Sequence, residues 1–277
     1  IRICEQIVHL RTNDVEANHL LGLFYNEQGD VEKALPYLKR ACSLSPNNAI
    51  AHVSLGSIQR HRGQLAEAAA HFRTAIRIDE HASDAYYGLG QVLEEQGRQE
   101  DAKTRYTQTL LIVPNHAYAH HALSILLINQ RQYAEALSHA QQAIFIDPEK
   151  IEFLMVYASN LLSLGDSQTA QTVYHKVLSL KPEFVPAHNA LGGILQERGS
   201  PKEALVHYYR SRTIDPDQSE AFAQIGFCLV KLDRHSEALD AFFKSLENDP
   251  LQPKIHTQLS KLYCEPEKYQ RARRDLE

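Results

Sequence analysis

Apolar residues along this chain recur with the spacing of a helix face, and short polar turns separate the stretches. Residues 83–116 show the pattern clearly. One face of an expected first helix carries Tyr86, Leu89, Gly90 and Leu93, and one face of an expected second helix carries Ala102, Tyr106, Thr109 and Ile112. Gly97 lies between them, at an expected turn. Because the apolar spacing is three or four residues rather than two, the pattern predicts paired helices and no strands.

The helix pair repeats every 34 residues without an insertion. Complete repeats one to seven are expected at 15–48, 49–82, 83–116, 117–150, 151–184, 185–218 and 219–252. Residues 253–277 form a partial eighth repeat, and residues 1–14 match the second helix of a truncated repeat before the first. Since the register is unbroken, we expect one array over residues 1–277, with no hinge or second domain.

Three columns of the repeat carry most of the pattern. Position 20 is alanine in every frame: Ala34, Ala68, Ala102, Ala136, Ala170, Ala204, Ala238 and Ala272. Position 8 is always small, which lets two helices approach closely: Gly22, Gly56, Gly90, Ser124, Ala158, Gly192, Gly226 and Ser260. Proline ends six of the seven complete repeats and stops the second helix. In repeat six, Ser200 is expected to cap a helix that starts at Pro201, with Glu203 completing a capping box.

These columns resemble the tetratricopeptide repeat (TPR), and about eight frames extend the resemblance over the whole chain. The resemblance implies an all-α fold, a right-handed α-solenoid superhelix whose first helices line the concave surface. One column departs from the family. Position 4, where the family often has Trp, holds Asn18, His52, Tyr86, His120, Leu154, His188, Phe222 and His256.

The resemblance also implies a peptide-binding groove, lined by positions 2, 5, 9, 12 and 13 of the first helices. The peptide-binding residues expected from these positions are Leu23, Val53, Tyr87, Tyr118, His121, Ile125, Ile128, Met155, Leu162, Asn189, Phe227 and Val230. Exposed apolar side chains are informative in a groove, because packing does not require them there. Acidic residues outnumber basic ones at the same positions, so we expect a protein or peptide ligand with apolar anchors and basic flanks.

The expected function is a protein–protein interaction scaffold or adaptor that binds a polypeptide segment and has no catalysis of its own. Two alternatives stay open. The array could be the substrate-recruiting arm of a larger enzyme of the glycosyltransferase, sulfotransferase or methyltransferase type, whose catalytic domain lies outside the sequence. It could also assemble with copies of itself into a homo-oligomer.

Histidine is the one residue type that suggests other chemistry. His52, His120, His188 and His256 occupy position 4 of every second repeat. Position 4 packs between the two helices of a repeat, so these residues are interpreted as structural, and no metal or cofactor is expected. The sequence has no phosphate-binding loop, no HExxH and no nucleophile elbow, which agrees with a non-enzyme.

Composition and charge limit the partners and the cellular location that we expect. The net charge of −5 and the lack of a basic stripe argue against nucleic acid as a partner. The longest apolar run, near 122–128, is too short for membrane insertion. Four separated cysteines, Cys4, Cys42, Cys228 and Cys264, favour reduced thiols and a cytoplasmic location. The chain starts at Ile1 rather than Met, which indicates a piece of a longer protein, so a targeting segment lost upstream stays open.

Overall fold

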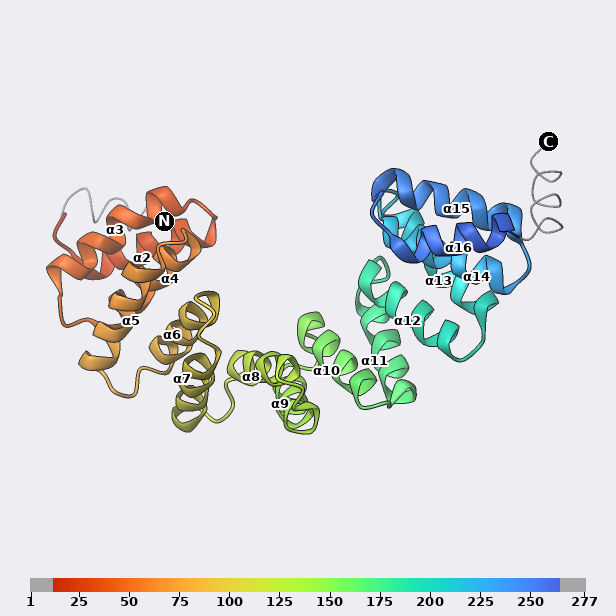
Figure 1. Cartoon of the computed structure of the whole chain (residues 1–277). Coiled ribbons are helices and arrows are strands. Elements are labelled where there is room, and N and C mark those ends of the chain that lie inside the picture. Colours follow the sequence, from red (N-terminus) through yellow and green to blue (C-terminus); the bar gives the residue numbers. More distant parts are fainter. Residues whose placement is uncertain (1–11, 265–277) are drawn as a thin grey trace. The chain divides into compact units, whose positions relative to one another are not determined.

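The computed structural model describes residues 12–264, which form helices and no strands (Figure 1). The first helices of the repeats are α2 (Val15–Glu27), α4 (Ala49–His61), α6 (Ser83–Glu95), α8 (Ala117–Asn129), α10 (Ile151–Ser163), α12 (Val185–Glu197), α14 (Ser219–Lys231) and α16 (Pro253–Cys264). The second helices are α3 (Val31–Leu44), α5 (Leu65–Ile78), α7 (Gln99–Ile112), α9 (Tyr133–Ile146), α11 (Ser167–Leu180), α13 (Pro201–Ile214) and α15 (His235–Asn248). The expected all-α solenoid fold is confirmed.

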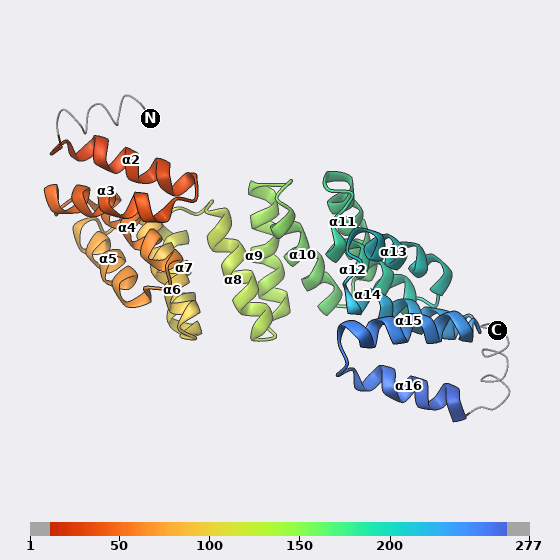
Figure 2. The same ribbon diagram turned by 90° about the horizontal axis from the view of Figure 1, so that it is seen from above.

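Each first helix begins at the first residue of a 34-residue frame, and those from α2 to α14 pack beside the second helix of their own repeat (Figure 2). The chain divides into two compact units, which meet between Asp147 and Pro148 and are described separately below. The single continuous array stays a prediction. The helix expected within 1–14 and the end of the partial repeat, from residue 265 on, lie outside the described residues.

The turn inside each repeat depends on one residue with a left-handed backbone. At position 15, Gly29, Gly63, Gly97, Gly165 and Gly199 all have φ between 73° and 84°. Repeats four and seven place Arg131 and Asp233 there instead, with φ of 60° and 57°. A side chain at such an angle costs free energy that glycine avoids, so two of the seven turns are strained.

The small residue at position 8 makes room for a large side chain at position 24 of the same repeat, except in repeat four, which has Ala140 there. A Cβ atom added to Gly90 would lie 2.5 Å from the ring of Tyr106, and one added to Gly226 would lie 2.4 Å from the ring of Phe242. The alanines at position 20 are fully buried in all seven complete repeats. These contacts explain why positions 8 and 20 hold small residues. A larger side chain at either position would collide with the facing helix of the same repeat.

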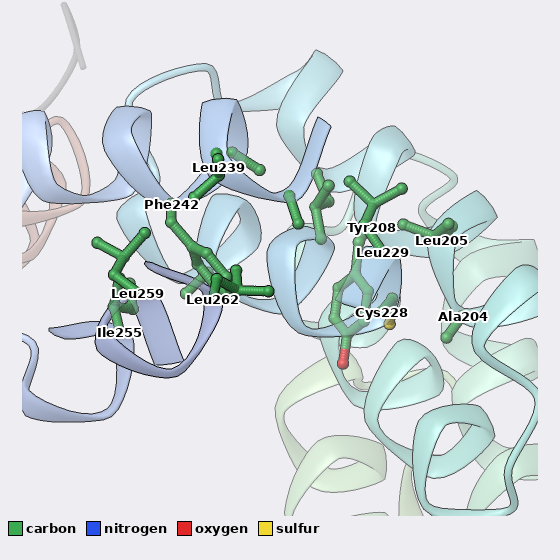
Figure 3. Packing of buried hydrophobic residues seen from close by; sticks show 14 of the residues in the cluster. Ala204, Leu205, Tyr208, Cys228, Leu229, Leu239, Phe242, Ile255, Leu259 and Leu262 are labelled. Carbon is green, nitrogen blue, oxygen red and sulfur yellow. The ribbon is translucent and has the colours of Figure 1, made fainter. Parts of the chain in front are cut away.

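The core of the second unit runs through its last four helices. Tyr208 of α13, Leu229 of α14 and Phe242 of α15 belong to one cluster of buried side chains, which reaches Ile255 and Leu259 of α16 (Figure 3). In the first unit, Phe72 of α5 is fully buried in a comparable cluster. Within each unit, neighbouring repeats thus share buried apolar side chains, as a solenoid requires.

One detail of the expected capping is wrong. Helix α13 does start at Pro201 after Ser200, but the Ser200 side chain makes no cap hydrogen bond. The Ser200 ψ of 62° is close to the ψ of 69° at Asp30 and Asp166, whose side chains are one bond longer and do reach the following amides. Asp14, Asp30, Asn48 and Asp166 do cap their helices through a side-chain oxygen.

Candidate functional site: a pocket among α12, α13 and α14

The side chains at positions 2, 5, 9, 12 and 13 of the first helices are called the first-helix face below. Of the twelve residues expected to bind a peptide, Tyr118 is 48% exposed, and the other eleven are half-buried. None of the twelve is fully buried. Every one of these side chains therefore keeps some surface that a partner could contact.

Several of the twelve also stabilise the fold. In the first unit, Val53 and Tyr87 pack against the buried cluster, and the Tyr87 ring lies 5.6 Å from the Tyr106 ring and 4.9 Å from the His116 ring. Burial raises the pKa of Tyr87 to about 12. In the second unit, the Phe227 ring lies 5.1 Å from the Phe242 ring, edge to face. An apolar residue on the first-helix face is therefore not by itself evidence of a ligand.

Polar side chains on this face of the first unit bond to other protein groups, either in the neighbouring repeat or within the same repeat. Nε2 of His19 on α2 lies 2.9 Å from Oγ of Ser54 on α4. The guanidinium of Arg60 on α4 pairs with Glu95 of α6 at 2.5 Å. The hydroxyl of Tyr106 donates to Oε2 of Glu94 at 2.6 Å. Part of the acidic charge that suggested basic flanks on the ligand is thus used within the protein.

In the second unit, the same face is hollowed into a pocket of about 320 Å³ among α12, α13 and α14. Most of its lining residues are of polar types. They come from two neighbouring first helices, α12 and α14, and from one aromatic residue of α13. The lining residues are Asn189, Gly193, Gln196, Glu197, Tyr208, Glu220, Gln224 and Lys231. Four of them, Asn189, Gly193, Gln196 and Glu197, occupy positions 5, 9, 12 and 13 of repeat six.

Gln196 is the centre of the hydrogen bonds around the pocket. Its side-chain oxygen accepts from the Tyr208 hydroxyl at 3.1 Å and from the Cys228 thiol at 3.5 Å. Its backbone oxygen accepts from Nζ of Lys231 at 3.4 Å. Gln224 is held in a similar way, because its amide donates to Oε1 of Glu220 at 2.8 Å. These bonds fix the polar walls, so the pocket needs little rearrangement to accept a ligand.

Asn189 offers the pocket a hydrogen-bond acceptor, and Gly193 leaves space for a ligand. The Asn189 amide donates to Oε1 of Gln218 at 3.2 Å, but its Oδ1 atom is buried and has no hydrogen-bond partner among residues 12–264. A buried acceptor without a partner is costly, and a donor on a ligand would relieve that cost. At Gly193 an added Cβ would lie 3.9 Å from the Tyr208 hydroxyl, the nearest atom, so this position is open space.

Sequence reasoning identified Asn189 but missed the rest of the pocket. Gly193, Gln196 and Glu197 occupy positions that the resemblance assigned to the groove. They are not among the expected peptide-binding residues, most of which are apolar. Tyr208 comes from a second helix, and the signal that could have found it is the pairing of position 8 with position 24. The expected apolar residues do not gather at this pocket, since none of them lines it.

Other chemistry has little support in the described part of the chain. Residues 12–264 contain no group of three or more His, Cys, Asp or Glu side chains placed to hold a metal ion. Burial raises the pKa of both described thiols, Cys42 and Cys228, to about 11, which disfavours a reactive thiolate. No helix over the same residues combines the length and the apolar character that a bilayer crossing demands.

The fold and this face define a class, the helical repeat proteins that expose one face of their first helices. Two family models, both described as tetratricopeptide repeat, match residues 59–126 and residues 21–83 and 158–219, more than half of the chain together. The chain belongs to the tetratricopeptide-repeat family. No curated protein matches it.

Solved structures agree with this fold at low sequence identity. The chain is similar to "APC/C hetero-tetramer Cut9-Hcn1" with a TM-score of 0.71 and 17% identity, covering 82% of this chain and 45% of that one. PilF of Pseudomonas aeruginosa gives a TM-score of 0.68 and 17% identity, covering 77% of this chain and 97% of that one. YrrB, described as "a TPR protein with an unusual peptide-binding site", gives 0.58 and 21%, covering 66% and 95%.

Proposed function

We propose that this chain is a protein-interaction scaffold that binds a polypeptide segment at the first-helix face, with the pocket among α12, α13 and α14 as its strongest contact in the second unit. The observation that carries the proposal is the pocket itself. Its volume of about 320 Å³ lies at the lower end of the range typical of ligand sites, and it accommodates one or two side chains of a peptide.

The chemistry of the walls indicates what kind of segment fits. The Oδ1 atom of Asn189 is an acceptor without a partner among residues 12–264, and Glu197, Glu220 and Lys231 line the same pocket. A peptide brings donors of two kinds, its backbone N–H groups and its basic side chains. YrrB, whose description names a peptide-binding site, shares the fold and supports the proposal by analogy only.

The test is a substitution that fills the pocket without disturbing the core. Gly193→Leu adds bulk where the nearest atom lies 3.9 Å from the new Cβ, and replacing glycine within a helix favours the helix. The matched control is Thr213→Leu, which places the same side chain on an exposed position of α13 outside the pocket.

A peptide is first selected from a random displayed library against the unmodified chain. Gly193→Leu is expected to weaken its binding at least tenfold, about 1.4 kcal/mol, while Thr213→Leu leaves the affinity unchanged. Equal affinity of the chain and Gly193→Leu for every selected peptide would contradict the proposed site.

A further inference from the structure

Three repeats contain a pair of histidines, a buried one on the first helix and a half-buried one on the second. Position 4 and position 23 of repeats two, four and six hold His52 with His71, His120 with His139, and His188 with His207. Their Nδ1 atoms face one another at 2.9, 2.9 and 3.2 Å. No other complete repeat has histidine at either position; those repeats hold Asn18 with Tyr37, Tyr86 with Arg105, Leu154 with Val173, and Phe222 with Ala241.

The hydrogen-bond partners determine where the protons lie. Nε2 of His188 lies 3.0 Å from the backbone oxygen of Pro182, which can only accept, so this nitrogen must carry a hydrogen. The neutral His188 ring then has a lone pair at Nδ1, and His207 must donate its own Nδ1–H to it. His52 with Pro46 and His120 with Pro114 repeat the arrangement at 3.1 and 3.0 Å.

This arrangement holds at most one additional proton per pair. A first proton can enter at Nε2 of the second-helix histidine and leaves the Nδ1–H···Nδ1 bond in place. A second proton would have to enter at Nδ1 of the first-helix histidine, where it would turn the acceptor into a donor. The bond would then be replaced by two cations in contact. The first-helix histidines are 8–9% exposed, so water cannot screen that repulsion well.

We propose that the three imidazole pairs make repeats two, four and six acid-labile, so that the two helices of these repeats separate more readily below neutral pH than those of the other repeats. The device is built from three features, namely the facing Nδ1 atoms, the proline carbonyl that fixes the tautomer, and the burial of the inner ring.

Neighbouring charges modify each pair differently. Lys39 of α3 faces the pair of repeat two, and His175 of α11 faces the pair of repeat six. Lys103 of α7 and His116 at the start of α8 face the pair of repeat four, together with Glu135 of α9, the only carboxylate among these groups. All of them except Glu135 oppose protonation. In repeat four Glu135 partly offsets Lys103 and His116, whereas the pair of repeat six has no such carboxylate beside it among residues 12–264, so repeat six is the better place to test the proposal.

The direction of the histidine pKa values agrees with the geometry. Burial, followed by the charge of the paired ring, lowers the pKa of His71, His139 and His207 in the folded chain. In the unfolded chain both rings of each pair titrate near 6.5. The unfolded state therefore binds more protons below that pH, and stability falls as the pH drops from about 6.5 toward the lower folded pKa values.

The test compares two neighbouring repeats of the second unit in the same molecule. Amide hydrogen exchange of the full chain is measured at pH 7.5 and 5.0 and corrected for the intrinsic exchange rate at each pH. We expect the opening equilibrium of α12 and α13, in repeat six, to rise at least tenfold more than that of α10 and α11, in repeat five.

Two variants of repeat six sharpen the result with pairs that other repeats already use. His188→Leu with His207→Val copies repeat five, and His188→Asn with His207→Tyr copies repeat one. Either variant should remove the acid-induced difference. An equal rise in both repeats of the unmodified chain would overturn the proposal, and that measurement does not depend on whether the variants fold. An ordinary pKa of His207 in an NMR titration would overturn it as well.

Helix α12 also carries Asn189 and Gly193 of the pocket, so acid opening of repeat six would loosen the pocket. This consequence rests on the proposed function, whereas the exchange experiment involves no ligand. If the unmodified chain shows no acid-induced difference between repeats five and six, the proposed effect of the histidine pairs is wrong, and the proposal of peptide binding is unaffected.

Discussion

Repeats five and six are neighbours in the second unit that differ in how their two helices are joined. Both bury an aromatic residue at position 24, Tyr174 or Tyr208, and a fully buried alanine at position 20. Repeat five then places Leu154 at position 4, whereas repeat six places His188 there. The comparison teaches that one packing site accepts an apolar or a polar occupant, provided that every nitrogen of the polar one finds a partner.

The largest effect should come from the feature that the two repeats share. Tyr174→Ala and Tyr208→Ala each remove a nearly fully buried ring. Each is expected to cost roughly 3–5 kcal/mol of the free energy of unfolding, as other large aromatic-to-alanine changes in cores do. Denaturant unfolding at pH 7.5 measures both losses. A cost below about 1 kcal/mol at either site would show that the position-24 ring does not hold the repeat together.

A second prediction moves the histidine pair into repeat five. Leu154→His with Val173→His should make the stability of the chain more dependent on pH. For each proton that the folded repeat excludes, the free energy of unfolding should fall by about 1.4 kcal/mol per pH unit below pH 6.5. Denaturant unfolding between pH 7.5 and 5.0 measures the slope.

The control for the transferred pair is Leu154→Asn with Val173→Tyr, the pair of repeat one. It should lower stability by a similar amount at pH 7.5 without changing the slope. If the histidine variant has the slope of the unmodified chain, two facing imidazoles do not create acid sensitivity.

The smallest effect is expected at the turns, where repeats five and six are alike. Gly165→Ala and Gly199→Ala add a methyl group at φ of 84° and 78°, with nothing within 4 Å of the new Cβ. Only backbone strain remains, so each should cost about 1 kcal/mol, equally at pH 7.5 and 5.0. Thermal unfolding at the two pH values checks this. A pH-dependent cost would mean that the turn and the histidine pair are coupled.

Much of the fold could be predicted from the sequence because it depends on local spacing. The 34-residue register places the start of every described first helix, from Val15 to Pro253, and the alanines of position 20 mark the helix contact. The interpretation of position 4 as a packing site is correct for His52, His120 and His188, which are buried, whereas His256 at the same position is exposed. Each of these features repeats, so eight frames of one sequence supply the evidence.

The site was harder to predict because it depends on contacts between helices. The pairing of His188 with His207 is visible as a 19-residue spacing only once the second helix is known to turn its position 23 toward position 4. The pocket depends on the absence of a side chain at Gly193 and on the orientation of Gln196, and neither follows from helical spacing. The expected apolar anchors, such as Phe227, are partly used by the core instead.

The proposed function requires that a polypeptide binds the first-helix face at the pocket of repeat six. The most direct measurement is an NMR titration of the isotope-labelled chain with a library-selected peptide, following the side-chain amide signals of Asn189, Gln196 and Gln224. The account predicts that these three signals shift together with the backbone signal of Gly193. Saturated binding that moves only signals of the second helices, such as Thr213, would contradict it.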